Sequence, residues 1–215
     1  MSGDLNEARA RMVQEQIEAR GIRDSRVLTA MRAVERHRFI PAEFADHAYD
    51  DGPLPIGGEQ TISQPYMVAL TCEAAALSGG ERVLEVGTGS GYEAAVLAHL
   101  VRELYTIECL EHLHVRARIV LGAIGVANVR LVLGDGSEGC AKGAPYDAII
   151  VSAAMPGIPM PMLRQLGPGG RLVAPIGEDE LQSLVRISLK NGHWQEEYFG
   201  ECRYVKMTGK HGFTE

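Results

Sequence analysis

A short apolar run followed by three alternating glycines is the part of this sequence best suited to hold a ligand. Val83–Val86 has the composition of a strand, Gly87–Gly91 has a glycine at every second position, and a helix is expected from Tyr92. Glycine permits the positive φ angles and the close backbone approach that such a turn needs. The free N–H groups and the positive dipole end of the following helix would face whatever lies in the turn.

An acidic residue at the end of the next apolar run indicates what the turn binds. Leu104–Ile107 is strand-like and is followed by Glu108. A carboxylate in that position can accept hydrogen bonds from ribose hydroxyls, so the two features together predict an adenosine-containing cofactor. NAD and FAD are disfavoured, because their G-x-G-x-x-G fingerprint has a glycine where this chain has Tyr92. A tight strand-to-helix connection without a ligand is the alternative, which the preceding strand and the acid make weaker.

Length, composition and charge favour a single enzyme domain with no nucleic-acid or membrane partner. The chain has 215 residues, 46% of them hydrophobic, and a formal net charge of -7, which suits an apolar core and disfavours a nucleic-acid surface. Its four cysteines form no C-x-x-C pair, so neither a metal site nor a disulfide framework is predicted. No apolar N-terminal core and no apolar run of about 18 residues is present, and we predict a cytoplasmic protein.

From residue 82 onward, strand-like and helix-like segments alternate, which predicts an α/β fold with a doubly wound, mainly parallel sheet. Strands are expected at Val83–Val86, Glu103–Ile107, Val129–Leu133, Ala148–Val151 and Arg171–Pro175. Helices are expected at Tyr92–His99, Glu111–Ile124 and Met160–Leu166. Asn191-Gly192 is a strong hairpin signal, so Leu184–Lys190 and Trp194–Val205 should form an antiparallel C-terminal pair at the sheet edge.

The N-terminal residues should form a helical extension that packs on this sheet. A first helix should end at Gly21, and a second, capped by Asp24, should end at Pro41. Tyr49–Gln60 is dense in Gly, Pro and Asp and is expected to be a loop, after which Pro65 opens a helix. We predict one domain over residues 1–215, composed of the extension (1–50), a loop and helix (51–80), a binding core (81–177) and a C-terminal hairpin and tail (178–215).

In open parallel sheets, ligands lie at the carboxyl ends of the strands, near the point where the strand order reverses. Four segments should meet there: Gly87–Gly91, Glu108, Gly134–Gly136 and Val151–Ala154. Asp135 could accept a hydrogen bond from an adenine amino group, or it could be an Asp-Gly turn residue that bonds its own backbone. Glu85, just before the glycine turn, could hold that turn or face an amino group of the cofactor.

The run Gln60–Ala69 joins the expected loop to the next helix and contains Ser63, two residues before Pro65. Judged on the local sequence alone, Ser63 is better suited to cap the helix than to take part in chemistry. Neither a His–Asp pair nor a metal-binding cluster is evident in the sequence.

The chain resembles the protein-L-isoaspartate (D-aspartate) O-methyltransferase family over nearly its whole length. The similar stretches are Met12–Ile17, Arg20–Ile22, Val34–Pro41, Leu54–Gly57, Gln60–Ala69, Val83–Tyr92, Gly134–Gly136, Tyr146–Val151 and Leu166–Gly177. Many S-adenosylmethionine-dependent methyltransferases share the glycine turn as their motif I, whereas Thr61-Ile62-Ser63 after the Pro-Ile-Gly loop makes the resemblance narrow. The resemblance implies a Rossmann-like methyltransferase fold and the cofactor S-adenosyl-L-methionine, with S-adenosyl-L-homocysteine as product and no metal.

The same resemblance implies methyl transfer to the free α-carboxylate of L-isoaspartyl residues in damaged proteins and peptides. A carboxylate with a pKa of about 4 is ionised at neutral pH, so no general base is required. The resemblance assigns the active-site role to Ser63, which we interpret as a hydrogen-bond donor that orients the carboxylate. The alternatives are another methyl acceptor, or a non-catalytic module that binds the cofactor or a peptide.

The residue roles follow from the position of each residue and from the resemblance. The predicted cofactor-binding residues are Thr61, Ile62, Glu85, Gly87, Thr88, Gly89, Gly91, Glu108, Asp135, Gly136 and Thr208. The predicted substrate-binding residues are Ile56, Ser63, Val205 and Lys206, the last two in a tail that could pair backbone-to-backbone with an extended peptide. Lys206 replaces a proline that is frequent in the family, which affects the detail of peptide binding. A monomer is the remaining expectation.

Overall fold

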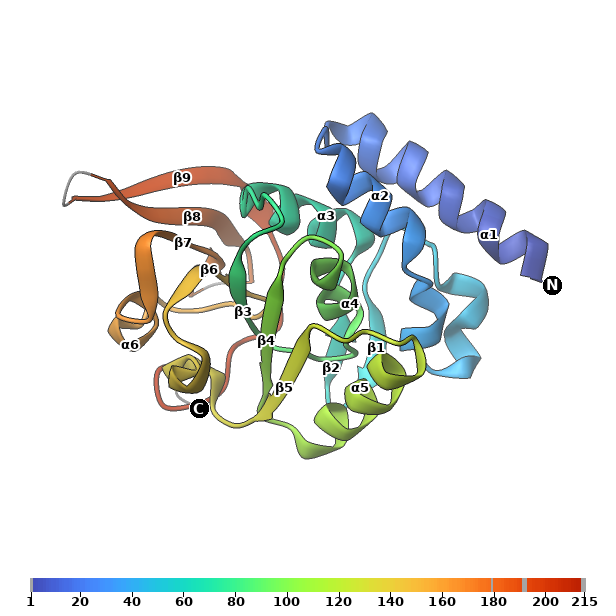
Figure 1. Cartoon of the computed structure of the whole chain (residues 1–215). Coiled ribbons are helices and arrows are strands. Elements are labelled where there is room, and N and C mark those ends of the chain that lie inside the picture. Colours follow the sequence, from blue (N-terminus) through green and yellow to red (C-terminus); the bar gives the residue numbers. More distant parts are fainter. Residues whose placement is uncertain (1, 179, 191–192, 214–215) are drawn as a thin grey trace.

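The computed structural model describes residues 2–178, 180–190 and 193–213. In that part of the chain, a seven-stranded sheet has the order β5-β4-β3-β6-β7-β8-β9 (Figure 1). Its strands are β3 (Arg82–Val86), β4 (Glu103–Glu108), β5 (Val129–Leu133), β6 (Tyr146–Val151), β7 (Leu166–Ile176), β8 (Gln182–Lys190) and β9 (His193–Cys202). The strands from β5 to β7 are parallel and β8 and β9 are antiparallel. The predicted doubly wound, mainly parallel α/β fold with an antiparallel C-terminal pair is confirmed.

The strand order reverses between β3 and β6. The chain passes from β3 outward to β4 and β5, then returns to the other side of β3 as β6. Val86 pairs with Ile107 on one side and with Val151 on the other, so the three strands end level with one another. A crevice at the carboxyl ends is expected at this point, because the connecting segments diverge from it in opposite directions.

Alternate residues along the central strands enter two separate apolar clusters, as the period of two requires. In β3, Val83 belongs to the cluster that contains the N-terminal helices, α3 (Pro65–Ala74), α4 (Tyr92–Ala98) and α5 (Glu111–Ala123). Leu84 and Val86 belong to the cluster on the other face, with residues such as Met162 of α6 (Met160–Leu163). Both faces of the sheet are therefore covered (Figure 1).

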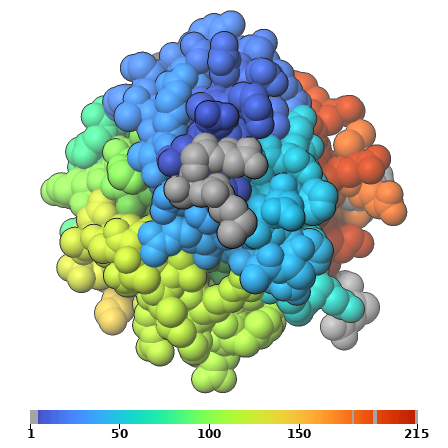
Figure 2. All heavy atoms as spheres, turned by 90° about the vertical axis from the view of Figure 1, so that its right-hand side faces the viewer, coloured from blue at the N-terminus to red at the C-terminus, as the bar shows by residue number. Residues whose placement is uncertain are grey.

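The N-terminal extension is helical, but it is more irregular than the sequence predicts. After α1 (Ser2–Arg11) the chain continues as a π-helical turn (Met12–Ile17) and a 3-10 turn (Glu18–Arg20), and Gly21 ends it with φ 106°. Helix α2 (Ser25–Ala33) is capped as expected, because the Asp24 carboxylate accepts from the N–H of Arg26 at 2.9 Å. Figure 2 shows these blue segments covering the face of the molecule above the yellow-green residues of α5.

The prediction that the second helix ends at Pro41 is wrong. Helix α2 ends at Ala33, and 3-10 turns follow at Arg36–Phe39 and Ala42–His47. Arg36 is fully buried there, where its Nε donates to the carbonyl of Ala48 at 2.8 Å. Satisfying this buried guanidinium requires carbonyls from a folded-back segment, which a continuing helix would not present.

The prediction of a loop over Tyr49–Gln60 is also wrong, because part of this segment is a hairpin. Strand β1 (Leu54–Gly57) pairs antiparallel with β2 (Gln60–Ile62). The two residues between the strands, Gly58 and Glu59, have φ of 60° and 58°. Positive φ at both positions matches the twist of a two-residue hairpin turn. The glutamate at the second turn position hid this hairpin, since that place usually holds Gly, Asn or Asp.

Other element ends differ from the expectations by several residues. Helix α6 stops at Leu163 instead of residue 166, and β7 begins at Leu166 instead of Arg171, because Leu166 pairs with Tyr146 across a bulge. Strand β9 ends at Cys202 instead of Val205. The turn predicted at residues 191–192 lies outside the described residues.

Candidate functional site

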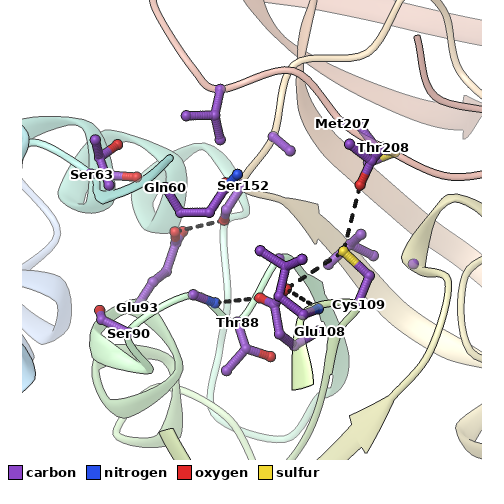
Figure 3. Close-up of a pocket in the computed structure, with 18 of the residues that line it drawn as sticks. Gln60, Ser63, Thr88, Ser90, Glu93, Glu108, Cys109, Ser152, Met207 and Thr208 are labelled. Atoms are coloured by element: carbon purple, nitrogen blue, oxygen red, sulfur yellow. Dashed lines mark hydrogen bonds between the residues drawn. The ribbon is translucent and has the colours of Figure 1, made fainter. Parts of the chain in front are cut away.

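A cavity of about 280 Å³ lies at the carboxyl edge of the sheet, where the strand order reverses (Figure 3). This volume lies near the lower limit of small-molecule sites, roughly 300 Å³. Segments that are distant in sequence form its walls: the glycine turn, the ends of β4 and β6, the β1–β2 hairpin and the C-terminal tail. Of the predicted site residues, those that line it are Thr61, Ile62, Ser63, Gly87, Thr88, Gly89, Glu108, Gly136, Val205, Lys206 and Thr208.

The glycine turn forms the floor of the cavity and is held by the neighbouring strand. Gly87 and Gly89 have φ of 95° and 53°, values that residues other than glycine rarely adopt. The backbone N–H groups of Gly87 and Thr88 donate to the carbonyl of Ile107 in β4, at 2.9 Å and 3.3 Å. Gly91 does not line the cavity; a Cβ there would lie 3.3 Å from the Cβ of Ala117, so this glycine allows α5 to pack closely.

Glu108 occupies the end of β4 and lines the cavity, as predicted for an acid that meets a ribose. Only 6% of Glu108 is exposed. Its Oε2 accepts from the N–H of Gly89 at 2.8 Å, and its Oε1 accepts from the N–H of Leu110 at 3.0 Å. The carboxylate therefore joins the glycine turn to the start of α5 while remaining in the cavity wall (Figure 3).

Three of the predicted site residues lie behind the cavity wall. Ile56 is buried in the apolar cluster beside the hairpin. Glu85 is fully buried and accepts a hydrogen bond from the hydroxyl of Thr106. Asp135 accepts from the N–H of Ser137 at 2.8 Å and from the N–H of Lys210 at 2.9 Å. Asp135 is thus an Asp-Gly turn residue that also anchors the C-terminal tail.

Ser63 lies on the cavity wall at the start of α3 but does not cap this helix. The N-cap residue is Gln64, and no side chain makes a cap hydrogen bond. Among the described residues, the Ser63 hydroxyl has no hydrogen-bond partner, so it is available to a ligand. The N-cap interpretation of Ser63 is wrong, because Pro65 at the first helical position places the cap one residue later.

The C-terminal tail closes the cavity opposite the glycine turn. The N–H of Ala154 donates to the carbonyl of Val205, and the N–H of Met207 donates to the carbonyl of Ala154, both at 2.8 Å. The hydroxyl of Thr208 lies 3.5 Å from the Sγ of Cys109, next to Glu108 (Figure 3). The tail is therefore fixed to the chain that leaves β6, and Thr208 reaches the cavity, as the sequence predicts.

A second cavity, of about 450 Å³, adjoins the first. The two cavities share four lining residues: Thr61, Ser63, Ser152 and Val205. The second cavity also has Arg20, Tyr66 and Tyr204 in its walls. Ser63 therefore stands between two spaces, one over the glycine turn and one bounded by α3 and the tail.

Several residues of the first cavity were not predicted from the sequence. Glu93 was not singled out, although it is a charged residue inside the otherwise apolar helix Tyr92–Ala98, where every residue from 92 to 97 is buried. Gln60, Ser137 and Met207 also line the cavity. Gln60 belongs to the hairpin and Met207 to the tail, for which the local sequence has no periodic signal, whereas Ser137 lies in the 3-10 turn after β5.

The described residues contain neither a metal-binding cluster nor a membrane-spanning helix. No group of three or more His, Cys, Asp or Glu side chains in that part of the chain could hold a metal ion. None of the helices there is long and apolar enough to cross a membrane.

Comparisons with known proteins agree over almost the whole chain. The family model described as Protein-L-isoaspartate(D-aspartate) O-methyltransferase (PCMT) matches residues 7–212. Protein-L-isoaspartate O-methyltransferase 2 of Geotalea uraniireducens (strain Rf4) is 50% identical over 212 residues, 98% of each chain. Protein-L-isoaspartate O-methyltransferase 1 of Rhodopseudomonas palustris (strain HaA2) is 51% identical over 208 residues, covering 96% of this chain and 85% of that protein.

Solved structures agree as well. A protein-L-isoaspartate O-methyltransferase structure superposes with a TM-score of 0.84 at 28% identity, covering 95% of this chain and 67% of the other. A beta-aspartate methyltransferase (PCMT) from Plasmodium falciparum, in complex with S-adenosyl-L-homocysteine, superposes with a TM-score of 0.79 at 25% identity, covering 91% and 96%. With its parallel sheet, its glycine turn and these relatives, the chain belongs to the protein-L-isoaspartate (D-aspartate) O-methyltransferase family.

Proposed function

We propose that this protein transfers the methyl group of S-adenosyl-L-methionine to the free α-carboxylate of L-isoaspartyl residues in damaged proteins and peptides, the first step of their repair. The observation that carries the proposal is the position of Ser63. Its unpaired hydroxyl stands where the cavity over the glycine turn meets the second cavity. A methyl donor and a carboxylate acceptor held in the two spaces would meet at this residue.

The residues of the first cavity fit the cofactor. Glu108 presents a buried carboxylate that can accept from ribose hydroxyls, and the turn at Gly87–Gly89 lets a ligand approach the backbone. The acids Glu59, Glu93 and Glu108 outnumber Lys206, the one Lys, Arg or His among the described lining residues. Such a wall favours a ligand of net positive charge. When bound, the cofactor supplies an already activated methyl group.

The protein's own contribution is to hold and orient the reactants. The isoaspartyl α-carboxylate is ionised at neutral pH and is itself the nucleophile, so the site needs no general base. The Ser63 hydroxyl donates a hydrogen bond that points one carboxylate oxygen toward the methyl donor. Fixing two reactants in line can contribute roughly 7–11 kcal/mol to the acceleration, which accounts for a site without a His–Asp pair.

The peptide around the isoaspartyl residue would occupy the second cavity and the edge of the tail. Ala154 and Lys206 form an isolated parallel β-bridge. In it, the N–H of Ala154 donates to the carbonyl of Val205, and the carbonyl of Ala154 accepts from the N–H of Met207. The N–H and carbonyl of Lys206 have no backbone partner among the described residues. They can pair with an extended peptide whatever its side chains, which suits an enzyme that must accept many sequences.

Methyl transfer to a matched pair of peptides tests the proposal. Labelled S-adenosyl-L-methionine is offered with an isoaspartyl peptide or with its aspartyl counterpart. We expect a base-labile methyl ester on the isoaspartyl peptide only. In Ser63→Ala, loss of a hydrogen bond to a charged group costs about 1.5–3 kcal/mol, so kcat/KM should fall by roughly 10- to 150-fold. Ser25→Ala, an exposed serine on α2, is the matched control and should retain the wild-type rate.

Absence of transfer to either peptide, with the cofactor still bound, would contradict the proposal. It would favour another methyl acceptor or a binding module. The further predictions, that the protein acts as a monomer in the cytoplasm without nucleic acid or a membrane, stay predictions. Light scattering of the purified protein tests the first of them.

A further inference from the structure

Glu93 is a buried carboxylate in the wall of the cofactor cavity, and the reaction outlined above makes no use of it. It is the only charged residue of α4 and is 6% exposed. Its Oε2 accepts from the Ser152 hydroxyl at 2.7 Å. Its Oε1 is buried and has no hydrogen-bond partner in the described part of the chain. Figure 3 shows the side chain extending from α4 toward Ser152 at the end of β6.

Glu93 lies close to the place where methyl transfer is proposed to occur. Ser152, its hydrogen-bond partner, lines both cavities, and the same two cavities share Ser63. The Glu93 carboxylate therefore lies at the junction where the methyl donor and the acceptor are proposed to meet. An ionised carboxylate at that point would lie close to whatever positive charge the donor carries.

No cation in the described part of the chain neutralises Glu93. Among the described residues, no lysine, arginine or histidine forms an ion pair with it. The ionisable groups that face it are Glu85 of β3, Cys72 of α3 and Tyr204 of the tail, and Glu85 in turn faces Glu108. Burial raises the pKa of Cys72 and of Tyr204, and burial and Glu93 together raise the pKa of Glu85. Cys72 and Tyr204 are therefore uncharged near neutral pH, and none of the three groups supplies a positive charge to Glu93.

Glu93 itself can therefore be either protonated or ionised near neutral pH. Burial raises the pKa of Glu93 to about 7, although the hydrogen bond from Ser152 lowers it. An isolated carboxylate in such a site is costly when ionised, and a nearby positive charge reverses that cost. The charge carried by a ligand in the cavity thus decides the protonation state of Glu93.

We infer that Glu93 is the residue by which the cavity distinguishes the sulfonium cofactor from its thioether product. The carboxyl group is ionised when a sulfonium occupies the cavity and protonated when a thioether does. This inference rests on the proposed function, because it takes the two ligands from that reaction. Glu93 is a specificity-determining residue here, separate from the orienting role of Ser63.

The charge balance of methyl transfer explains the preference. A carbon–oxygen bond forms on the acceptor carboxylate, the carbon–sulfur bond breaks, and its electron pair stays on sulfur. The negative charge of the acceptor and the positive charge on sulfur are both lost. The cavity then holds a ligand with one positive charge fewer, and Glu93 takes up a proton from solvent. Ionised Glu93 attracts the sulfonium and gains nothing from the neutral sulfur of the thioether, so this residue favours the cofactor relative to the product.

Calorimetric binding of S-adenosyl-L-methionine and of S-adenosyl-L-homocysteine over a range of pH tests the inference. The ligand that favours ionised Glu93 should bind more tightly as the pH rises through the pKa of Glu93, about 7. We expect the preference for the sulfonium over the thioether to increase by up to about tenfold from about pH 6 to about pH 8. Thioether affinity should not increase over the same range.

Three variants assign the pH dependence to this residue. Glu93→Gln keeps the shape of the side chain and should abolish the pH dependence of the preference. Ser152→Ala removes the hydrogen bond that favours the ionised form, so the midpoint should move to higher pH. Glu111→Gln removes an exposed acid at the start of α5 that does not line the cavity, so the preference should change with pH as it does in the wild type.

The inference is overturned if the wild-type preference for the sulfonium over the thioether is independent of pH. It is also overturned if this preference changes with pH in Glu93→Gln as it does in the wild type. If Glu93→Gln does not fold, the midpoint in Ser152→Ala decides, and a midpoint equal to that of the wild type counts against Glu93. Failure of the wild type to bind either ligand would instead overturn the proposed function. Binding of both with a flat preference would leave that function intact.

Discussion

Replacement of Glu108 by glutamine separates the two roles that the structure gives to this carboxylate. Each of its oxygens accepts from one backbone N–H group, Gly89 at 2.8 Å and Leu110 at 3.0 Å. Glutamine has almost the same shape, but only one of its terminal atoms can accept. The amide NH₂ would face an N–H donor, and one of the two backbone groups would lose its partner.

The cost of this change follows from the hydrogen bonds. A buried donor without a partner costs about 1–3 kcal/mol, so the free energy of unfolding of Glu108→Gln should be lower by about that amount. A hydrogen bond to a charged group contributes about 1.5–3 kcal/mol, so loss of the charge should also weaken S-adenosyl-L-methionine binding by roughly tenfold or more.

Urea unfolding measures the first quantity and calorimetric titration of the cofactor measures the second. Glu111→Gln is the matched control, because Glu111 is exposed at the start of α5 and removal of its charge there should cost less than about 1 kcal/mol. A Glu108→Gln protein with wild-type stability and wild-type cofactor affinity would refute the reasoning on both roles.

Two further substitutions test contacts that stabilise the fold. Glu81 accepts from the N–H and the hydroxyl of Ser78 at 2.8 Å and 2.6 Å, and although burial opposes ionisation, these bonds lower the pKa of Glu81 from 4.5 to about 2. The resulting stabilisation, about 3 kcal/mol, is complete above about pH 4.5 and is lost as the pH falls toward 2. Urea unfolding of wild type and Glu81→Gln should therefore show a difference at about pH 6 that closes in acid; a constant difference would argue against it. In Gly136→Ala the new Cβ would lie 2.6 Å from Cγ1 of Val86, whereas in Gly134→Ala the nearest atom would be at 3.5 Å. Only the first should lose about 1–3 kcal/mol in a thermal or urea unfolding experiment, and equal losses would contradict the overpacking account.

The sequence by itself determined the sheet and the floor of the cofactor cavity. Three local features carried this information: the strand periodicity, the glycines at Gly87–Gly91 and the acid at Glu108. Each can be recognised from a few consecutive residues, because neighbours in the chain determine the conformation of a strand and of the turn that follows it. For the same reason Asp24 could be recognised as a helix cap before the structure was known. These features lie within the short range over which residue type decides backbone conformation.

The tertiary structure alone decided the parts of the site that depend on distant segments. The β1–β2 hairpin was missed because Glu59 adopts a positive φ that its residue type does not predict. Asp135 faces the returning tail at Lys210, a contact across 75 positions of sequence. The Glu93 carboxylate meets Ser152 only because α4 packs beside the end of β6. The charge of a buried acid is set by such neighbours and by its depth, and neither is present in the local sequence.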